Sequence, residues 1–132
     1  MGALRVAAWV VAAWALVCPA ALGAEREVPP AQGWVTDLAG MISPEAEQGL
    51  EQRMEAYQRG TGHDVALLTV PSLDGDSLEG FALRVAREWG LGSEQTNDGA
   101  LLLVVADSRQ VRLEVGRGLE GDLTDAASGR II

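Results

Sequence analysis

The sequence lacks the motifs of the common enzyme classes. Its 132 residues include no lysine, one histidine (His63) and one cysteine (Cys18). Ser72 follows an expected strand but has no G-x-S-x-G context, which argues against a nucleophile elbow. The glycines between 116 and 121 match neither G-x-G-x-x-G nor a P-loop, which would need a following lysine. Nothing in the chain resembles a catalytic triad, a redox centre or a nucleotide pocket, and a lone histidine in a turn is more often incidental than catalytic.

An apolar run long enough to cross a bilayer is also missing from the front of the chain. Residues 1–24 contain Arg5 as their only charge, then an apolar stretch at 6–17, then small residues up to Ala24. This is the layout of a secretory signal, and the stretch is shorter than the roughly 20 residues of a transmembrane helix. We therefore expect a signal peptide at 1–24, cleaved near Ala24 or Glu25, and an extracytoplasmic protein, periplasmic or secreted.

The single cysteine lies inside this signal. Lipid attachment to Cys18 is disfavoured, because the branched Val17 stands where a small residue is expected. Cleavage at 24 or 25 leaves a mature protein with no cysteine. That excludes disulfides, thiol catalysis and thiolate metal sites from its function.

Negative charge dominates the mature chain. All nineteen acidic residues follow position 24, against nine of the ten arginines, which gives the mature protein a net charge of −10. A domain with this charge repels nucleic acid and anionic lipid headgroups. We expect no nucleic-acid partner.

The residues from 34 to 132 are expected to form one α/β domain. The preceding stretch 25–33 holds two prolines without periodicity and reads as an extended lead-in. Ser43 as N-cap and Pro44 at the first helical position predict a helix that ends at the glycines 60 and 62. The other expected elements are a strand at 65–70, a helix from about 76 or 77 to Trp89, and strands at 100–106 and 111–115.

The order of these elements predicts the topology. Strand, helix and strand from 65 to 106 call for parallel strands joined by a right-handed crossover, and the unbroken apolar run at 100–106 is typical of a central strand. The strand at 111–115 follows by hairpin and is antiparallel. The expected fold is a small mixed β-sheet flanked by helices, an α/β/α sandwich. A last helix capped by Thr124 is expected, and it reaches Ile132 without a closing signal. Whether a membrane tether follows it therefore stays open.

This topology brings acidic loops together at one edge of the sheet. The parallel strands start at that edge and the antiparallel strand ends there, so the loops 97–99 and 116–125 converge. Their carboxylates, with carbonyls of glycine-rich turns, form a hard-oxygen environment suited to Ca²⁺ or Mg²⁺. By spacing alone, the same residues also fit turn chemistry and a negatively charged first helical turn. The acidic residues at this edge are Asp98, Glu120, Asp122 and Asp125, with Asp64 close by.

Five segments in succession resemble the motifs of the TPM domain family. They are V-T-D-L-A-G at 35–40 followed by Ser43, V-P-S-L at 70–73, W-G-L-G at 89–92, N-D-G at 97–99 with leucines at 101–103, and E-V-G-R-G-L-E-G at 114–121 with L-T-D at 123–125. The resemblance spans about 34–132. It implies a Rossmann-like α/β/α sandwich in an extracytoplasmic protein, often with a membrane segment after the domain.

The resemblance also implies functions. Members of the family include a thylakoid-lumen protein linked to photosystem II repair and an accessory protein of acetylcholine receptors, and calcium or magnesium binding and acid phosphatase activity are attributed to some members. On the family pattern, Asp98 and Asp125 are the first metal candidates, followed by Asp37 and Glu120, whereas Asp122 is less typical.

Three functional hypotheses follow. The first is an exported metal-binding accessory domain that assists assembly, repair or regulation of a membrane protein complex. The alternative is a divalent-metal-dependent acid phosphatase, for which no catalytic residues can be assigned. The absence of lysine, and of an arginine cluster near the acidic edge, counts against it, although Arg112 and Arg117 are within reach. A plain spacer module is the third.

Overall fold

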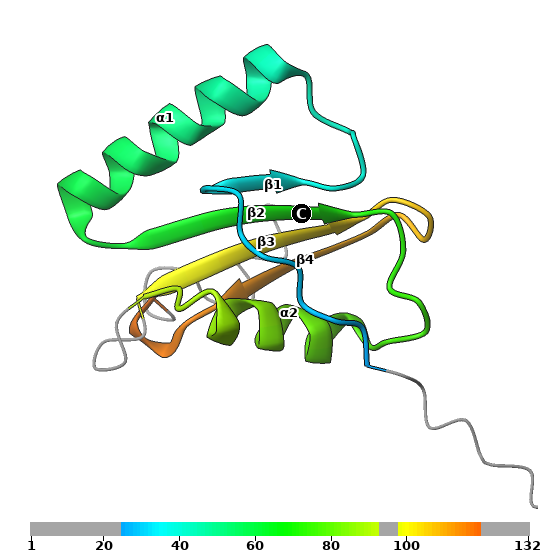
Figure 1. Ribbon diagram of the computed structural model, residues 1–132. Coiled ribbons are helices and arrows are strands. Elements are labelled where there is room, and N and C mark those ends of the chain that lie inside the picture. Colours follow the sequence, from blue (N-terminus) through cyan, green and yellow to red (C-terminus); the bar gives the residue numbers. More distant parts are fainter. Residues whose placement is uncertain (1–24, 93–97, 120–132) are drawn as a thin grey trace, which may run out of the picture.

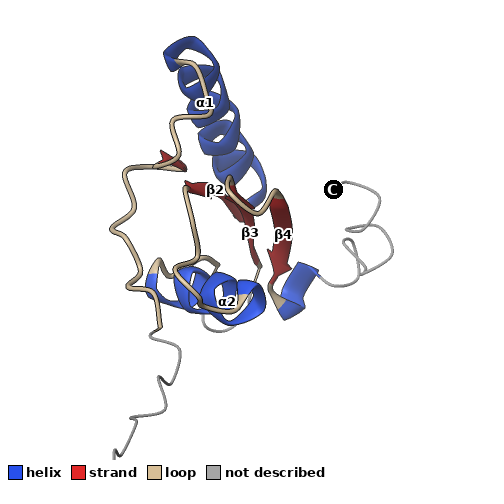
Figure 2. Cartoon of the chain, turned by 90° about the vertical axis from the view of Figure 1, so that its right-hand side faces the viewer, coloured by secondary structure: helices blue, strands red, loops and turns tan. Residues whose placement is uncertain are grey.

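The computed structural model describes residues 25–92 and 98–119, which form a four-stranded sheet with a helix on either side (Figures 1 and 2). The elements are β1 (Val35–Asp37), α1 (Pro44–Thr61), β2 (Asp64–Val70), α2 (Leu78–Glu88), β3 (Gly99–Val105), β4 (Gln110–Val115) and a 3₁₀ turn, η1 (Arg117–Leu119). The signal peptide expected at 1–24 and the helix expected from Thr124 lie outside the described residues. The α/β fold with a mixed sheet is confirmed.

The strands lie in the order β1-β2-β3-β4. β1, β2 and β3 are parallel, and β4 is antiparallel to β3. β3 is therefore a central strand with neighbours on both sides, as its unbroken apolar sequence predicted. β1 was not expected from the sequence; its three residues pair with Leu67, Leu68 and Thr69 of β2.

α1 begins and ends at the residues that the capping pattern indicated. The hydroxyl of Ser43 accepts a hydrogen bond from the Ala46 N–H at 3.2 Å, and Pro44 occupies the first helical turn. Gly62 ends the helix in the left-handed region at φ +78°, which a residue without a Cβ adopts without strain. The helix packs on β1 and β2.

α2 covers the opposite face of the sheet and closes the main core. Ser77 caps it, and Phe81, Ala82 and Val85 are fully buried against alternate residues of β2 and β3. Burying a large apolar side chain contributes roughly 1.5–3 kcal/mol each, so this layer holds the helix in place. The strand residues facing it are Ala66, Leu68, Val70, Leu101, Leu103 and Val105.

The lead-in at 25–33 packs against the fold, so the packed unit starts before residue 34. Val28 packs against the core beside α2, and the Trp89 indole N–H donates to the Pro29 carbonyl at 2.8 Å. Glu51 of α1 then accepts hydrogen bonds from the backbone N–H groups of Trp34 and Val35, at 3.1 and 2.6 Å. The lead-in thus runs from α2 to β1 across the front of the sheet in Figure 1.

Among residues 25–92 and 98–119, no helix is both long and apolar enough to cross a membrane.

Candidate functional site

The start of β2, the start of β3 and the end of β4 meet at one edge of the sheet. Asp64 opens β2 and pairs with Gly99, the first residue of β3. The Gly116 N–H, just past β4, donates to the Gly99 carbonyl at 2.8 Å. In the described residues, the start of β3 thus meets the chain just after β4, and Asp98 directly precedes Gly99. We call Asp64, Asp98, Gly99 and Gly116 the acidic edge.

Two glycines allow a close backbone crossing at this edge. A Cβ on Gly99 would lie 2.5 Å from the Leu91 carbonyl carbon, and one on Gly92 would lie 2.5 Å from the Gly99 nitrogen. Gly92 also has φ +77° and donates its N–H to Asp64 Oδ2 at 2.8 Å. Gly92 therefore lies against the backbone of Asp98 and Gly99 and also binds the Asp64 carboxylate, which links the starts of β2 and β3.

Asp37 lies at the other end of the sheet. It pairs with Thr69, five residues along β2 from Asp64. At about 3.3 Å per residue, that separates Asp37 from the acidic edge by roughly 17 Å. Asp37 and Asp98 therefore cannot bind the same ion, because parallel strands keep their first and last residues at opposite edges.

The Asp37 carboxylate organises the turn after β1. Its oxygens accept hydrogen bonds from the Thr69 hydroxyl and from the backbone N–H groups of Met41 at 3.0 Å and Ile42 at 2.9 Å. Burial raises the pKa of Asp37, but the hydrogen bonds from Thr69, Met41, Ile42 and Gly40 outweigh it and lower the pKa below its ordinary value. These contacts give Asp37 a structural task in holding the loop between β1 and α1.

The acidic edge is the place where the sequence predicts a hard cation. Carboxylates and backbone carbonyls are the ligands that Ca²⁺ and Mg²⁺ take in proteins. Asp64 and Asp98 supply two carboxylates, whereas Glu120 and Asp125, the other predicted ligands, lie outside the described residues. Within 25–92 and 98–119 no three His, Cys, Asp or Glu side chains gather as a metal-binding group.

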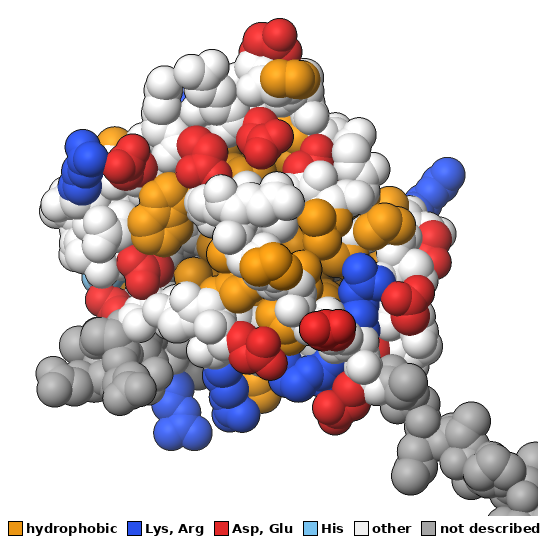
Figure 3. Space-filling model, viewed as in Figure 1, with side chains coloured by type: hydrophobic (Ala, Val, Ile, Leu, Met, Phe, Trp, Pro, Cys, Tyr) orange, Lys and Arg blue, Asp and Glu red, His pale blue; other side chains and the backbone are white. Residues whose placement is uncertain are grey.

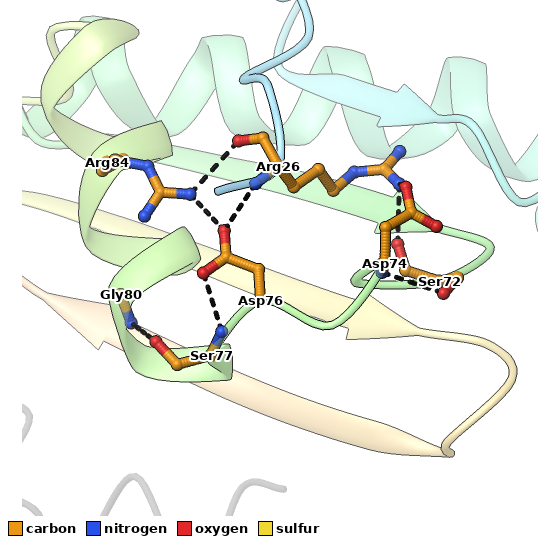
Figure 4. A network of polar contacts seen from close by, with 7 residues as sticks. All are labelled: Arg26, Ser72, Asp74, Asp76, Ser77, Gly80 and Arg84. Atoms are coloured by element: carbon orange, nitrogen blue, oxygen red, sulfur yellow. Dashed lines mark hydrogen bonds and ion pairs between the residues drawn. The ribbon is translucent and has the colours of Figure 1, made fainter. Parts of the chain in front are cut away.

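A second polar cluster, which sequence reasoning did not find, ties the lead-in to α2 (Figure 4). Asp76 Oδ2 accepts from the Arg26 backbone N–H at 2.9 Å and from the Arg84 guanidinium, which also donates to the Arg26 carbonyl at 3.2 Å. The Arg26 side chain turns to the loop after β2 and contacts the Ser72 carbonyl and the Asp74 carboxylate, at 2.8 and 2.6 Å. Both guanidinium groups lie 5.8 Å from the centre of the Phe81 ring.

Asp76 is the buried centre of this network. Its side chain is 8% exposed. Burial raises the pKa of Asp76, and the Arg84 side chain, the backbone N–H groups of Arg26 and Ser77 and the Arg84 charge together lower it below its ordinary value. Local spacing suggests neither partner of Asp76: Arg84 lies eight residues away and Asp76 precedes α2, whereas Arg26 lies 50 residues away.

Comparison with known protein families shows which family this chain belongs to. The model of the TPM domain matches residues 35–132. The chain belongs to the TPM domain family. The match begins at β1 of this TPM domain and includes the acidic edge. It also includes Glu120 and Asp125.

A solved structure agrees with this assignment. The TPM domain is similar to the N-terminal domain of a protein from P. gingivalis, determined in solution by NMR, with 43% sequence identity and a TM-score of 0.69. The likeness covers 75% of this chain and 63% of that chain. No curated protein matches the sequence.

Proposed function

We propose that this TPM domain is an exported accessory domain that binds a divalent cation, Ca²⁺ or Mg²⁺, at the acidic edge and acts beside a membrane protein complex. The observation that carries the proposal is the meeting of Asp64, Gly99 and Gly116 next to Asp98. Asp125 and Glu120 follow on the chain that leaves this edge and would complete the ligand set.

The chemistry of the chain favours binding over catalysis. Two of the predicted ligands, Asp98 and Asp37, lie in the described part of the domain, at opposite ends of the sheet. The Asp37 carboxylate already accepts hydrogen bonds from the turn after β1. A phosphatase needs charge-neutralising groups around the transferred phosphoryl in addition to the metal. Arg112, one candidate for that task, donates to Glu114 at 3.0 Å.

The test is a titration of the full chain with Ca²⁺ and with Mg²⁺, followed by backbone amide NMR. We expect shifts concentrated at Asp64, Gly92, 97–99 and 116–125. The absence of shifts in these segments at millimolar cation would refute the metal site.

The Asp98→Asn, Asp125→Asn double variant separates the two functions. It should lose the cation-dependent shifts, whereas Asp107→Asn, an exposed carboxylate in the β3–β4 turn, should keep them. A metal-dependent hydrolysis of p-nitrophenyl phosphate that the double variant abolishes would replace the binding function with a phosphatase. Hydrolysis at equal rates in all variants would exclude the acidic edge as its source.

A further inference from the structure

A pocket of about 390 Å³ opens between the two helices, where the lead-in enters β1. It lies on the β1 side of the sheet, away from β4, and its volume is in the range of small-ligand pockets. The described residues that line it are Ala31, Gly33, Trp34, Glu51, Glu55, Ala66, Trp89 and Leu91. We call it the tryptophan pocket.

The walls combine aromatic surface with negative charge. Trp34 and Trp89 are both half-buried, and they are the two tryptophans of the described chain. Glu51 and Glu55 line the α1 side, and no arginine is among the described residues that line the pocket. Tryptophan faces attract cations through the ring quadrupole, and carboxylates form charge-assisted hydrogen bonds with guanidinium and ammonium groups. This pairing recognises a cation on an apolar stem.

The two glutamates are held differently. Glu51 is fixed by the backbone N–H groups of Trp34 and Val35 and keeps its carboxylate at the pocket wall. Glu55 is half-exposed and accepts one hydrogen bond at 2.8 Å from Arg59, whose side chain is 73% exposed. Such surface pairs contribute little, so an incoming cation can compete with Arg59 for Glu55.

The surroundings of the pocket favour a protein partner. In Figure 3, hydrophobic side chains gather across the middle of this face, between α1 above and α2 below; acidic side chains border them above and on both sides, and arginines lie at the right and lower margins. The chain carries net charge −9 and no lysine, so a second copy of it is a poor match for this surface. A basic segment with apolar neighbours matches it in both charge and polarity.

We propose that the tryptophan pocket binds an arginine or lysine side chain of a partner protein, with the aliphatic stem against the tryptophans and the cationic head at Glu55. This partner is the one that the proposed accessory function requires, and the pocket rests on that function only in assuming that a partner protein exists. It needs no metal ion.

The test is an NMR titration of the full chain in EDTA with the peptide acetyl-Leu-Arg-Leu-amide. The comparison peptide replaces arginine by citrulline, which has the same shape and no charge. We expect the indole N–H signals of Trp34 and Trp89 and the amide of Glu55 to shift with the arginine peptide, and to shift much less with the citrulline peptide. Raising the salt concentration should weaken binding.

Two charge-matched variants localise the effect. Glu55→Gln removes one carboxylate of the pocket and leaves the hydrogen bonds of Glu51 in place. It should lower the affinity for the arginine peptide by about threefold to fivefold. Glu79→Gln removes an equal charge from an exposed position in the first turn of α2 and should leave binding unchanged.

Three results would overturn the proposal: no shifts at the tryptophans with the arginine peptide, equal affinity for the citrulline peptide, or equal affinity of the two variants. Asp98→Asn should bind the peptide as the parent does. If the parent chain binds the arginine peptide but shows no cation-dependent shifts, the acidic-edge proposal fails and the tryptophan pocket stands.

Discussion

Two aspartates make charge-assisted hydrogen bonds that connect segments far apart in the sequence. Asp76 joins the lead-in to α2 through Arg26 and Arg84, and Asp37 joins β1 to the following turn and to Thr69 of β2. Hydrogen bonds to a charged group contribute about 1.5–3 kcal/mol, more than those between neutral groups. Neither role follows from local sequence, because the partners of Asp76 and Asp37 include residues 50 and 32 positions away.

Asp76→Asn should lower the free energy of unfolding by about 2 kcal/mol, because the Arg84 guanidinium loses its carboxylate in a site where Asp76 is 8% exposed. Urea unfolding at pH 7, followed by circular dichroism, measures the difference. Asp74→Asn is the control: Asp74 is 66% exposed and its pair with Arg26 should contribute less than about 1 kcal/mol. Equal effects of the two changes would contradict the assigned role of Asp76.

The lowered pKa of Asp76 predicts that its contribution to the free energy of unfolding is lost in acid. The pKa of Asp76 is lower in the folded protein than its ordinary value of 3.8, so its contribution is present above that pH and is lost as the pH falls through the folded pKa. The stability difference between the parent and Asp76→Asn should therefore shrink below about pH 4. Urea unfolding at a series of pH values between 7 and 2.5 tests this, and a difference that stays constant over the series would be inconsistent with it.

Among the helices and strands, those with strong local signals were predictable and those defined by long-range pairing were not. Ser43, Pro44 and Gly62 mark α1, and the apolar run beginning at Ala100 marks β3 as central. β1 has three residues, too few for a periodic pattern, and exists because it pairs with β2. The packing of 25–33 depends on single contacts with Trp89 and Asp76, which no periodicity could reveal.

Removal of the lead-in should therefore weaken the fold. A chain that starts at Gln32 lacks Val28, the acceptor for the Trp89 indole and the backbone N–H that binds Asp76, and we expect it to lose about 2–4 kcal/mol relative to a chain that starts at Glu25. Thermal and urea unfolding of both chains measure this. Glu27→Gln in the longer chain, at an exposed position, should change nothing. Equal stability of the two chains would show that the lead-in is dispensable.

For the molecule as a whole, topology determines which predicted ligands can act together. Parallel β1, β2 and β3 place Asp64 and Asp98 at one edge of the sheet and Asp37 at the other. The acidic edge was therefore predictable from element order. That Asp37 lies too far away to share its cation follows only from the pairing of β1 with β2. The family pattern grouped Asp37 with Asp98 because a pattern records residues and not distances.

Export is a prediction for the whole chain. When the full sequence is produced in a Gram-negative host, we expect the protein in the periplasmic fraction with an N-terminus at Ala24 or Glu25 and without Cys18. Mass spectrometry of the purified protein measures both. Full-length protein in the cytoplasm, or a product that retains Cys18, would contradict the signal assignment.

Calorimetric titration with Ca²⁺ tests the acidic edge most directly. The parent chain and Asp107→Asn should bind with the same affinity, and Asp98→Asn should bind at least about tenfold more weakly, because a hydrogen-bonding amide replaces a charged ligand of a hard cation. Equal Ca²⁺ affinity of Asp98→Asn and the parent, or no binding heat for the parent chain, would contradict a cation site at this edge.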